Sequence, residues 1–493
     1  MAASALQIPM QEARTLRFWR GTGDGRRETG NGKRETRDWE SFLARQRIIQ
    51  ILLSKMSDAT PIPAEMERRT SRVAGAVRAL KHRNFQLFFS GQLISLIGTW
   101  MQNVALAWLV YRLTGSSVLL GAMGFASQFP VFLAAPFGGI TADRHNRHRI
   151  VIATQTVSMI LAGVLAWITL SHIVQIWHLF VLAALLGVVN AFDIPARQAF
   201  IVDMVGREDL MNAIALNSSM FNGARVVGPA VAGILVAAIG EGWCFFANAV
   251  SFIAVIAGLL LMRVQSKPIA GTGQTPWEHI LEGFAFVRGT RPIRALLLLL
   301  GLVSLVGMPY AVLMPIFADK ILHGGARGLG ILMGATGVGA LMGALTLAAK
   351  KTLRGLGRWI TFAAAMFGAT LILFSLSKIF WLSVVFLLPV GFAMMLQMAS
   401  SNTLIQSMVP DRLRGRVMSV YSMMFMGMAP FGALFAGVMA KIVGAPLTIA
   451  MGGLACTAGA AVFGSRLSSI RAETRQLIIA QQAAGGDPAQ ETT

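Results

Sequence analysis

Two ionisable side chains, Asp193 and Arg225, lie inside long apolar stretches and are the residues of this sequence best suited to chemistry. Charges are costly at membrane depth and usually face the interior of a helix bundle or a water-filled path. Asp193 stands one helical turn before Arg197, which favours a structural ion pair, and its depth also makes it the best candidate for carrying a proton. Arg225 can attract an anionic or phenolate-bearing substrate, or it can pair with a helix-end carbonyl or with Asp193.

Arg225 shares one helical face with small and polar residues. Ser218, Asn222, Pro229 and Ala232 lie at spacings of three and four along the same stretch, so they point the same way. That face is too polar to be directed at lipid. Other polar side chains in apolar stretches can line a binding cavity or form hydrogen bonds between helices. These candidates are Gln102, Asn103, Asn190, Tyr310, Gln397 and Asn402.

A dense cluster of charge occupies the segment GGITADRHNRHRI at residues 138–150. Asp143 is expected to close a helix and to accept hydrogen bonds from the N-terminus of a neighbouring helix, where the dipole favours anions. Arg144, Arg147 and Arg149 can clamp carboxylates and backbone carbonyls. Such a charged latch would form when the adjoining mouth of the bundle is shut and break when it opens. The alternative is a solvated basic loop.

The small and turn residues of the same segment carry two further expectations. Gly138 and Gly139 would allow close approach of neighbouring helices. Asn146 stands at a turn that is expected to need a positive φ, which Asn tolerates. Both expectations concern backbone geometry and can be checked directly in a structure.

The sequence offers nothing for metal binding or covalent catalysis. Cys244 and Cys456 both fall in apolar stretches and give neither metal-ligand spacing nor a disulfide framework. The histidines include no H-E-x-x-H pattern, and His145 and His148 flank a turn beside arginines, which is a poor metal environment. We therefore expect no cofactor and no enzymatic activity, and a polytopic membrane enzyme is the disfavoured alternative.

The elements that carry these residues are membrane-spanning helices. The chain has 493 residues, of which 55% are hydrophobic and only 13% charged, and its mean hydropathy is +0.62. A helix of about twenty apolar residues spans a bilayer. Twelve stretches qualify: residues 86–110, 118–141, 150–171, 177–196, 212–238, 243–263, 294–316, 328–349, 359–377, 381–402, 417–440 and 443–463. The prediction is an all-α polytopic membrane protein.

The net charge of +21 is distributed as an orientation signal. Most Lys and Arg residues fall in the N-terminal tail, in alternate loops and in the C-terminal tail. The other loops contain only Arg112, Lys320, Arg327, Lys378 and Lys441. The positive-inside rule then places both termini in the cytoplasm. We expect the membrane to be the cytoplasmic (inner) membrane. Contact with anionic lipid is a secondary expectation, and nucleic-acid binding is not expected.

The chain divides into two halves with polar segments around them. Residues 1–83 are predicted to be a basic, disordered cytosolic tail, with Met56 and Met66 as alternative translation starts, and residues 466–493 a cytosolic C-terminal tail. Six helices at residues 84–264 and six at 292–465 flank a linker at 265–291. Within the linker an amphipathic helix is predicted from Trp277, Ile280, Leu281, Phe284 and Phe286.

The halves repeat one another. Before the fifth and eleventh spans, MVGREDLMNAIAL and MVPDRLRGRVMSV stand 204 residues apart. Small residues match at the same offset of 204: Gly223, Gly228, Ala232 and Gly233 correspond to Gly427, Gly432, Ala436 and Gly437. At an offset of 209, Gly115 and Gly121 correspond to Gly324 and Gly330. Duplicated halves put a central cavity at their interface and allow rocking around it, which suits a transporter.

The charged segment resembles the signature of the major facilitator superfamily, roughly G-x-L-a-D-R-x-G-R-R. Gly139, Asp143, Arg144, Arg147 and Arg149 lie on that signature. Thr141, Asn146 and His148 depart from it. The resemblance covers roughly residues 84–465 and implies a gating role for the matched residues. It also places the first, fourth, seventh and tenth helices around the cavity.

Two longer segments, residues 192–233 and 408–437, resemble the branch that holds bacterial enterobactin exporters and macrolide-efflux proteins. Within the first, ARVVGPAVAG is similar to the antiporter signature G-x-x-x-G-P-x-x-G-G. Gly228, Pro229 and Gly233 match it, while Ala224 and Ala232 replace glycines. In exporters this element implies tight packing of the fifth helix against the other half. The arginine that many relatives carry near Leu186 is absent.

The resemblance implies a monomeric secondary transporter that exports a small amphipathic molecule, a siderophore or a macrolide-like drug, by proton antiport. Its partners would be the substrate, membrane lipid and protons as the coupling ion. An importer or facilitator with the same fold is the alternative, and the direction of flux distinguishes the two.

Overall fold

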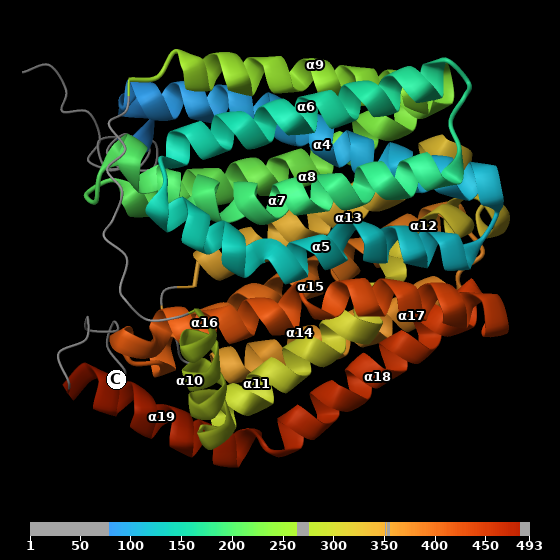
Figure 1. Ribbon diagram of the computed structural model, residues 1–493. Coiled ribbons are helices and arrows are strands. Elements are labelled where there is room, and N and C mark those ends of the chain that lie inside the picture. The colour runs from blue at the N-terminus through green and yellow to red at the C-terminus, as the bar shows by residue number, and fades with distance from the viewer. Residues whose placement is uncertain (1–77, 264–275, 351, 353–354, 484–493) are drawn as a thin grey trace, which may run out of the picture. The chain divides into compact units, whose positions relative to one another are not determined.

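The computed structural model describes residues 78–263, 276–350, 352 and 355–483, and every regular element among them is helical. These elements belong to one unit, Ala76–Thr493. Twelve helices are long and apolar enough to cross a membrane, which confirms the predicted all-α polytopic class (Figure 1).

In the first half the spans are α4 (Arg83–Thr114), α5 (Ser117–Arg144), α6 (Arg147–Leu170), α7 (Ile176–Val205), α8 (Leu210–Ile239) and α9 (Glu241–Leu260). In the second half they are Arg291–Ile321, α13 (Gly325–Ala348), α14 (Leu356–Leu376), α15 (Phe380–Met408), Arg412–Val443 and α18 (Ala445–Ser465). Within the described part of the chain, three further helices lie outside the spans: η1 (Arg78–Lys81), α10 (Pro276–Gly289) and α19 (Leu467–Ala483).

Two spans of the second half are interrupted. The span Arg291–Ile321 consists of α11 (Arg291–Leu302), the π-helical η2 (Val303–Gly307), α12 (Tyr310–Ile316) and the π-helical η3 (Phe317–Ile321). The eleventh span changes from α16 (Asp411–Phe425) to α17 (Met428–Val443) at Met426 and Gly427. π-Helical turns such as η2 and η3 often occur at functional positions.

Several helices are longer than the apolar pattern predicts. The fourth span continues to Val205, so Asp193 lies well inside it rather than near its end. The seventh span continues to Ile321 and thereby includes Asp319, which hydropathy alone leaves in a loop. Charged residues interrupt an apolar pattern without ending the hydrogen-bonded helix, so periodicity places helix ends poorly.

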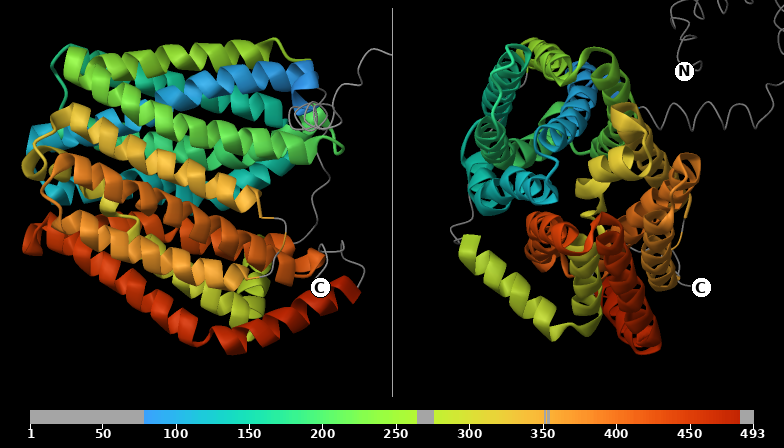
Figure 2. Two further views of the ribbon diagram at one scale, coloured as in Figure 1. Left: turned by 180° about the vertical axis from the view of Figure 1, so that it is seen from behind. Right: turned by 90° about the vertical axis from the view of Figure 1, so that its right-hand side faces the viewer.

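The duplicated halves fold alike. α5 packs on α7, and α4 and α6 pack on α9; in the second half α13 packs on α15, and α14 packs on α15 and α18. The right-hand view of Figure 2 separates the two sets of helices. The turns repeat as well, because Gly240 and Gly444, 204 residues apart, each have a φ of 89°, a conformation that favours glycine.

The linker between the halves contains a helix where the amphipathic pattern predicts one. α10 packs against α16, with Gly283 close to the backbone of Arg416 and with Glu282 paired to the Arg416 guanidinium. The predicted N-terminal tail lies outside the described residues up to residue 77, as does the end of the C-terminal tail from residue 484.

The two halves touch through α5 with α17 and through α8 with α13. At each contact two glycines face each other. A Cβ added to Gly437 would come 2.9 Å from the Cα of Gly121, and one added to Gly233 would come 2.9 Å from the Cα of Gly330. These are the residues that match between the halves, so one contact is the duplicate of the other.

We predict that Gly233→Ala destabilises the protein. The added methyl group meets backbone atoms of α13 that cannot move aside independently, and overpacking of this kind costs about 1–3 kcal/mol. Gly223→Ala is the matched control, because it lies on the same helix and its added Cβ meets no atom within 4 Å. Thermal unfolding of both purified variants in detergent tests the prediction, and equal melting temperatures would refute it.

Candidate functional site

Arg225 lies on α8 at the boundary between the two halves. Its guanidinium carbon is 5.7 Å from the centre of the Trp100 ring on α4, within range of a cation–π interaction. Its Nη2 is 3.7 Å from the Sδ of Met394 on α15, in the other half. Among the described residues no ion pair links Arg225 to a carboxylate. The residue is half-buried and charged, and its surroundings are aromatic and sulfur-containing.

Tyr310 completes these surroundings from the broken seventh span. It is 4% exposed, hydrogen-bonds to Thr336 on α13 and is close enough to Arg225 to interact with its charge. The candidate site therefore draws Trp100 and Arg225 from the first half and Tyr310, Thr336 and Met394 from the second. Of the residues predicted from sequence, the structure brings Arg225 and Tyr310 together here.

The direction in which Arg225 points follows from its neighbours on α8. Gly228 packs against α4 at Ile97 and Trp100, and Gly233 packs against α13 at Gly330. At about 100° per residue around the helix axis, Gly228 lies about 60° to one side of Arg225 and Gly233 lies about 80° to the other side. Arg225 therefore faces the space between α4 and α13, as its predicted polar face requires.

The same face of α8 is exposed from Arg225 to the end of the bundle that carries the charged segment, here called the basic end. Phe221, Ser218, Ile214 and Met211 lie within about 40° of Arg225 and are all exposed, Met211 to 77%. We call these four residues the open face. Val227 and Ile234 are exposed on the opposite side, which is the side available to lipid.

Gln128 on α5 is an exposed polar residue that the sequence pattern did not single out. It follows Gly121 and Gly124 on one face of α5, at spacings of seven and four. Both glycines pack on α17, whereas Gln128 is exposed. The sequence marks Gln128 only as a single glutamine in an apolar stretch. Gln102 gives the same signal, so this signal does not distinguish the two residues.

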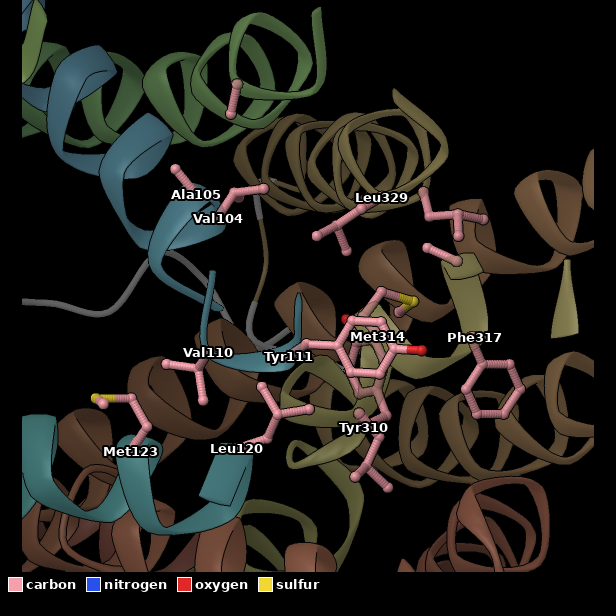
Figure 3. Close-up of a cluster of buried hydrophobic side chains, with 14 of the residues drawn as sticks. Val104, Ala105, Val110, Tyr111, Leu120, Met123, Tyr310, Met314, Phe317 and Leu329 are labelled. Atoms are coloured by element: carbon pink, nitrogen blue, oxygen red, sulfur yellow. The ribbon is translucent and has the colours of Figure 1, made fainter. Parts of the chain in front are cut away.

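At the opposite end, here called the far end, the halves are joined. The Tyr111 hydroxyl donates a hydrogen bond to Asp319 Oδ2 at 2.8 Å, which links α4 to η3. The Ser117 hydroxyl donates to the Gly437 carbonyl at 2.9 Å, which links α5 to α17. Around them the halves share one buried hydrophobic cluster, in which Tyr111, Tyr310 and Met314 are seen together in Figure 3. The far end is closed.

At the basic end the charged segment bonds within its own half. Arg147 is buried, donates to the carbonyls of Ala142 and Ala199, and pairs with Asp203 at 3.4 Å. Asp143 is 64% exposed, with Arg147 3.9 Å away. Arg144 and Arg149 are exposed. The described residues show no bond from these side chains to the second half, so a latch between the halves is not formed in this state.

Two backbone expectations for the charged segment need correction. Asn146 has a φ of −66° and is the N-cap of α6, where its side chain accepts from the Arg149 amide, so the predicted positive φ is wrong. Gly138 makes the close helix approach, because its added Cβ would overlap the Ala191 carbonyl of α7. Gly139 has open space around it, which contradicts the expectation that it does the same.

Asp193 is fully occupied inside the first half. Its Oδ1 accepts from Thr154 at 2.8 Å and from Gln155 at 2.9 Å, both on α6, and its Oδ2 pairs with Arg197 at 3.1 Å. The side chain is buried. The ion pair with Arg197 is present, and among the described residues no ion pair joins Asp193 to Arg225, a pairing that the sequence left open.

The remaining candidates do not converge on one site. Gln102 accepts a hydrogen bond from Asn248 at 2.8 Å and so joins α4 to α9, and Asn222 donates to the Ser218 carbonyl of its own helix. Asn402 accepts from Gln406, and Gln397 is buried. Asn103 is exposed and Asn190 is half-buried.

Comparison with known proteins places this geometry in context. Residues 74–482 match a family described as transmembrane secretion effector. The chain is 26% identical to the staphyloferrin A transporter of Staphylococcus aureus over 370 residues, which are 74% of this chain and 92% of that protein. It is 25% identical to the enterobactin exporter EntS of Escherichia coli over 344 residues, 69% of this chain and 81% of the exporter. It is 26% identical to macrolide efflux protein A of Streptococcus pyogenes over 256 residues, 50% and 62% of the two chains.

Solved structures share the fold at low sequence identity. A bacterial homologue of the iron transporter ferroportin in its inward-facing state superimposes with a TM-score of 0.61 at 16% identity, over 78% of this chain and 98% of that one. A POT family transporter in complex with a conjugated peptide gives a TM-score of 0.65 at 11% identity, over 79% and 96%. These likenesses concern the fold.

The hydrogen bond between Tyr111 and Asp319 predicts a measurable change in the far end. A hydrogen bond to a carboxylate is worth about 1.5–3 kcal/mol, so Tyr111→Phe should favour opening by about tenfold or more. Leu120, 3% exposed in the far-end cluster, can be replaced by Cys as a reporter. Tyr111→Phe should then speed labelling of that cysteine by a membrane-impermeant maleimide.

Tyr421→Phe is the matched control for this measurement. Its hydroxyl donates to the Met398 carbonyl within the second half, so its loss removes a tyrosine hydrogen bond without loosening the contact between halves. The native Cys244 and Cys456 are buried and give the background. Equal labelling rates in the two tyrosine variants would show that the far end does not depend on the Tyr111 bond.

Proposed function

The chain belongs to the major facilitator superfamily, in the family described as transmembrane secretion effectors, and from this membership we propose that it exports small amphipathic organic molecules. The molecule would be a siderophore or drug-like compound, carried across the cytoplasmic membrane by alternating access. The relatives named as staphyloferrin A transporter, enterobactin exporter and macrolide efflux protein support this substrate range. We take the transporter to act as a monomer, with lipid around the two halves.

One observation carries the proposal: the halves are joined at the far end, while an exposed face of α8 leads from Arg225 to the basic end. By the positive-inside rule the basic end, with both termini, faces the cytoplasm. The structure then corresponds to the state in which a transporter takes up its cargo from the cytoplasm. An exporter loads in this state. An importer or facilitator unloads in it and remains the alternative.

The charged segment supplies the complementary gate in this proposal. Asp143 is exposed while the basic end is open, so it is free to accept hydrogen bonds when that end closes. Arg147, already fixed to α7 through Asp203, holds the segment in place. A contact made in one state and lost in the other shifts the balance between states without adding to substrate affinity.

We propose protons as the coupling ion and Asp193 as the group that carries them. Among the described residues Asp193 is the buried carboxylate farthest from a helix end, whereas the buried Glu241 begins α9 and pairs with Arg112 at 2.8 Å. Protonation of Asp193 would release Arg197 and loosen the contact of α7 with α6. Coupling of this kind acts through the packing of the first half.

Flux in inside-out membrane vesicles tests the direction and the driving force. With an acidic lumen, vesicles containing the protein should accumulate added enterobactin or a macrolide, because the cytoplasmic face is then outside. A protonophore should abolish the accumulation. Uptake by right-side-out vesicles instead would support the importer, and accumulation that persists with the protonophore would rule out proton antiport.

Replacement of Asp193 separates coupling from structure. Asp193→Asn keeps most of the hydrogen bonds to α6 but cannot be protonated, so proton-driven accumulation should be lost. Exchange of labelled for unlabelled substrate, which needs no net proton movement, should persist. If both activities and the melting temperature fell together, Asp193 would be a structural residue.

A further inference from the structure

Among the described residues the half-buried Arg225 lacks the charged partner that each buried charge of the spans has. Asp193 pairs with Arg197, Glu241 with Arg112, and Arg147 with Asp203. A charge away from water is normally neutralised in this way. The only hydrogen-bond acceptor that the described residues offer to the Arg225 guanidinium is the thioether of Met394, a weak one. Its other N–H donors are therefore available to a ligand or to solvent rather than committed to a protein acceptor among the described residues.

The arrangement around the guanidinium suits an anion better than any other ligand. Trp100 lies against the cation and leaves its planar donor fork for carboxylate or phenolate oxygens. The Tyr310 hydroxyl is a further potential donor at the same place, on the other half. Beyond the charge, the open face offers Phe221, Ile214 and Met211 to an apolar body.

We propose that this site binds the carboxylate of an amphipathic organic anion, with the carboxylate oxygens on Arg225 and the rest of the molecule along the open face. The inference rests on the proposed function, because it takes the bound molecule to be the exported one. It narrows that function to organic anions and disfavours cationic drugs, which Arg225 repels.

The position of the site also makes the bound anion a bridge between the halves. Arg225 and Trp100 belong to the first half, whereas Tyr310 and Met394 belong to the second. The backbone of Arg225 contacts α13, since a Cβ added to Gly337 would come 2.9 Å from the Arg225 carbonyl. Rocking of the halves about this contact changes what surrounds the anion.

The experiment measures binding of 2,3-dihydroxybenzoate and of its neutral methyl ester to the purified protein by calorimetry. The acid should bind more tightly than the ester. Arg225→Gln should weaken acid binding about 10- to 100-fold, the range for a lost hydrogen bond to a charged group, and leave ester binding nearly unchanged. Arg225→Lys should fall between them, because a point charge lacks the planar fork.

Arg475→Gln is the control for net charge, since Arg475 is exposed on α19 and its loss should alter neither ligand. Melting temperatures of all variants identify a folding defect. If Arg225→Gln weakened the acid and the ester equally, or lowered the melting temperature with no selectivity between them, Arg225 would be structural and the anion site would be refuted. Arg225→Lys, which keeps the charge, tests the site even if the glutamine variant is unstable.

The vesicle assay separates this inference from the proposed function. Binding of the acid through Arg225, without accumulation in inside-out vesicles, would uphold the anion site and refute export. If the Arg225→Gln variant exported both acidic and neutral compounds as strongly as the native protein does, export would be upheld and the anion site refuted.

Discussion

The two halves meet backbone to backbone at two glycine pairs, Gly121 with Gly437 and Gly233 with Gly330, and these contacts determine where the halves join. Inside a bilayer, helices gain little from hiding apolar surface, because lipid is as apolar as they are. Close van der Waals packing must therefore hold the halves together, and it is strongest where no side chain intervenes. Both pairs lie toward the far end, so the halves are joined there and are free to diverge toward the basic end.

The position of Arg225 follows from that constraint. α8 touches α4 at Gly228 and α13 at Gly233, and Arg225 projects between the two contacts. It lies on the side of Gly233 toward the basic end, where the halves begin to part. The backbone of α8 still contacts α13 at this level, since a Cβ added to Gly337 would come 2.9 Å from the Arg225 carbonyl, while the Arg225 side chain projects into the space between α4 and α13. The glycines thus determine both where the halves join and where a charge can be accommodated.

The sequence predicts much of this arrangement from its repeats. Matching Gly121 with Gly330 and Gly233 with Gly437 identified the four residues of the two crossings before their contacts were known. A repeat cannot say which glycine faces which, because that depends on the packing of one half against the other. The helical face of Arg225 was predictable for the same reason: spacing alone determines direction along one helix.

The residues that the sequence did not predict carry no signal in hydropathy or spacing. Asp319 was missed because the apolar pattern ends at residue 316, while the helix continues through a π-helical turn that has no signal in hydropathy. Trp100 and Met394 were missed because an aromatic ring or a thioether in an apolar span looks like ordinary packing. Their roles arise only from proximity to Arg225, which depends on the meeting of three helices.

The duplicated halves have diverged in charge, and this determines how a ligand and a proton can act. At the offset of 204, Gln397 and Ser401 occupy the places of Asp193 and Arg197, and Ala429 occupies that of Arg225. The second half thus brings neutral surfaces to a site whose charges come from the first. Asp193 keeps all its contacts within the first half, so rocking of the halves leaves them intact. Arg225 contacts both halves, and its surroundings must change with every transition. In the proposed cycle, a ligand on Arg225 would therefore act on the transition directly, whereas a proton on Asp193 would act only by altering how α6 and α7 pack.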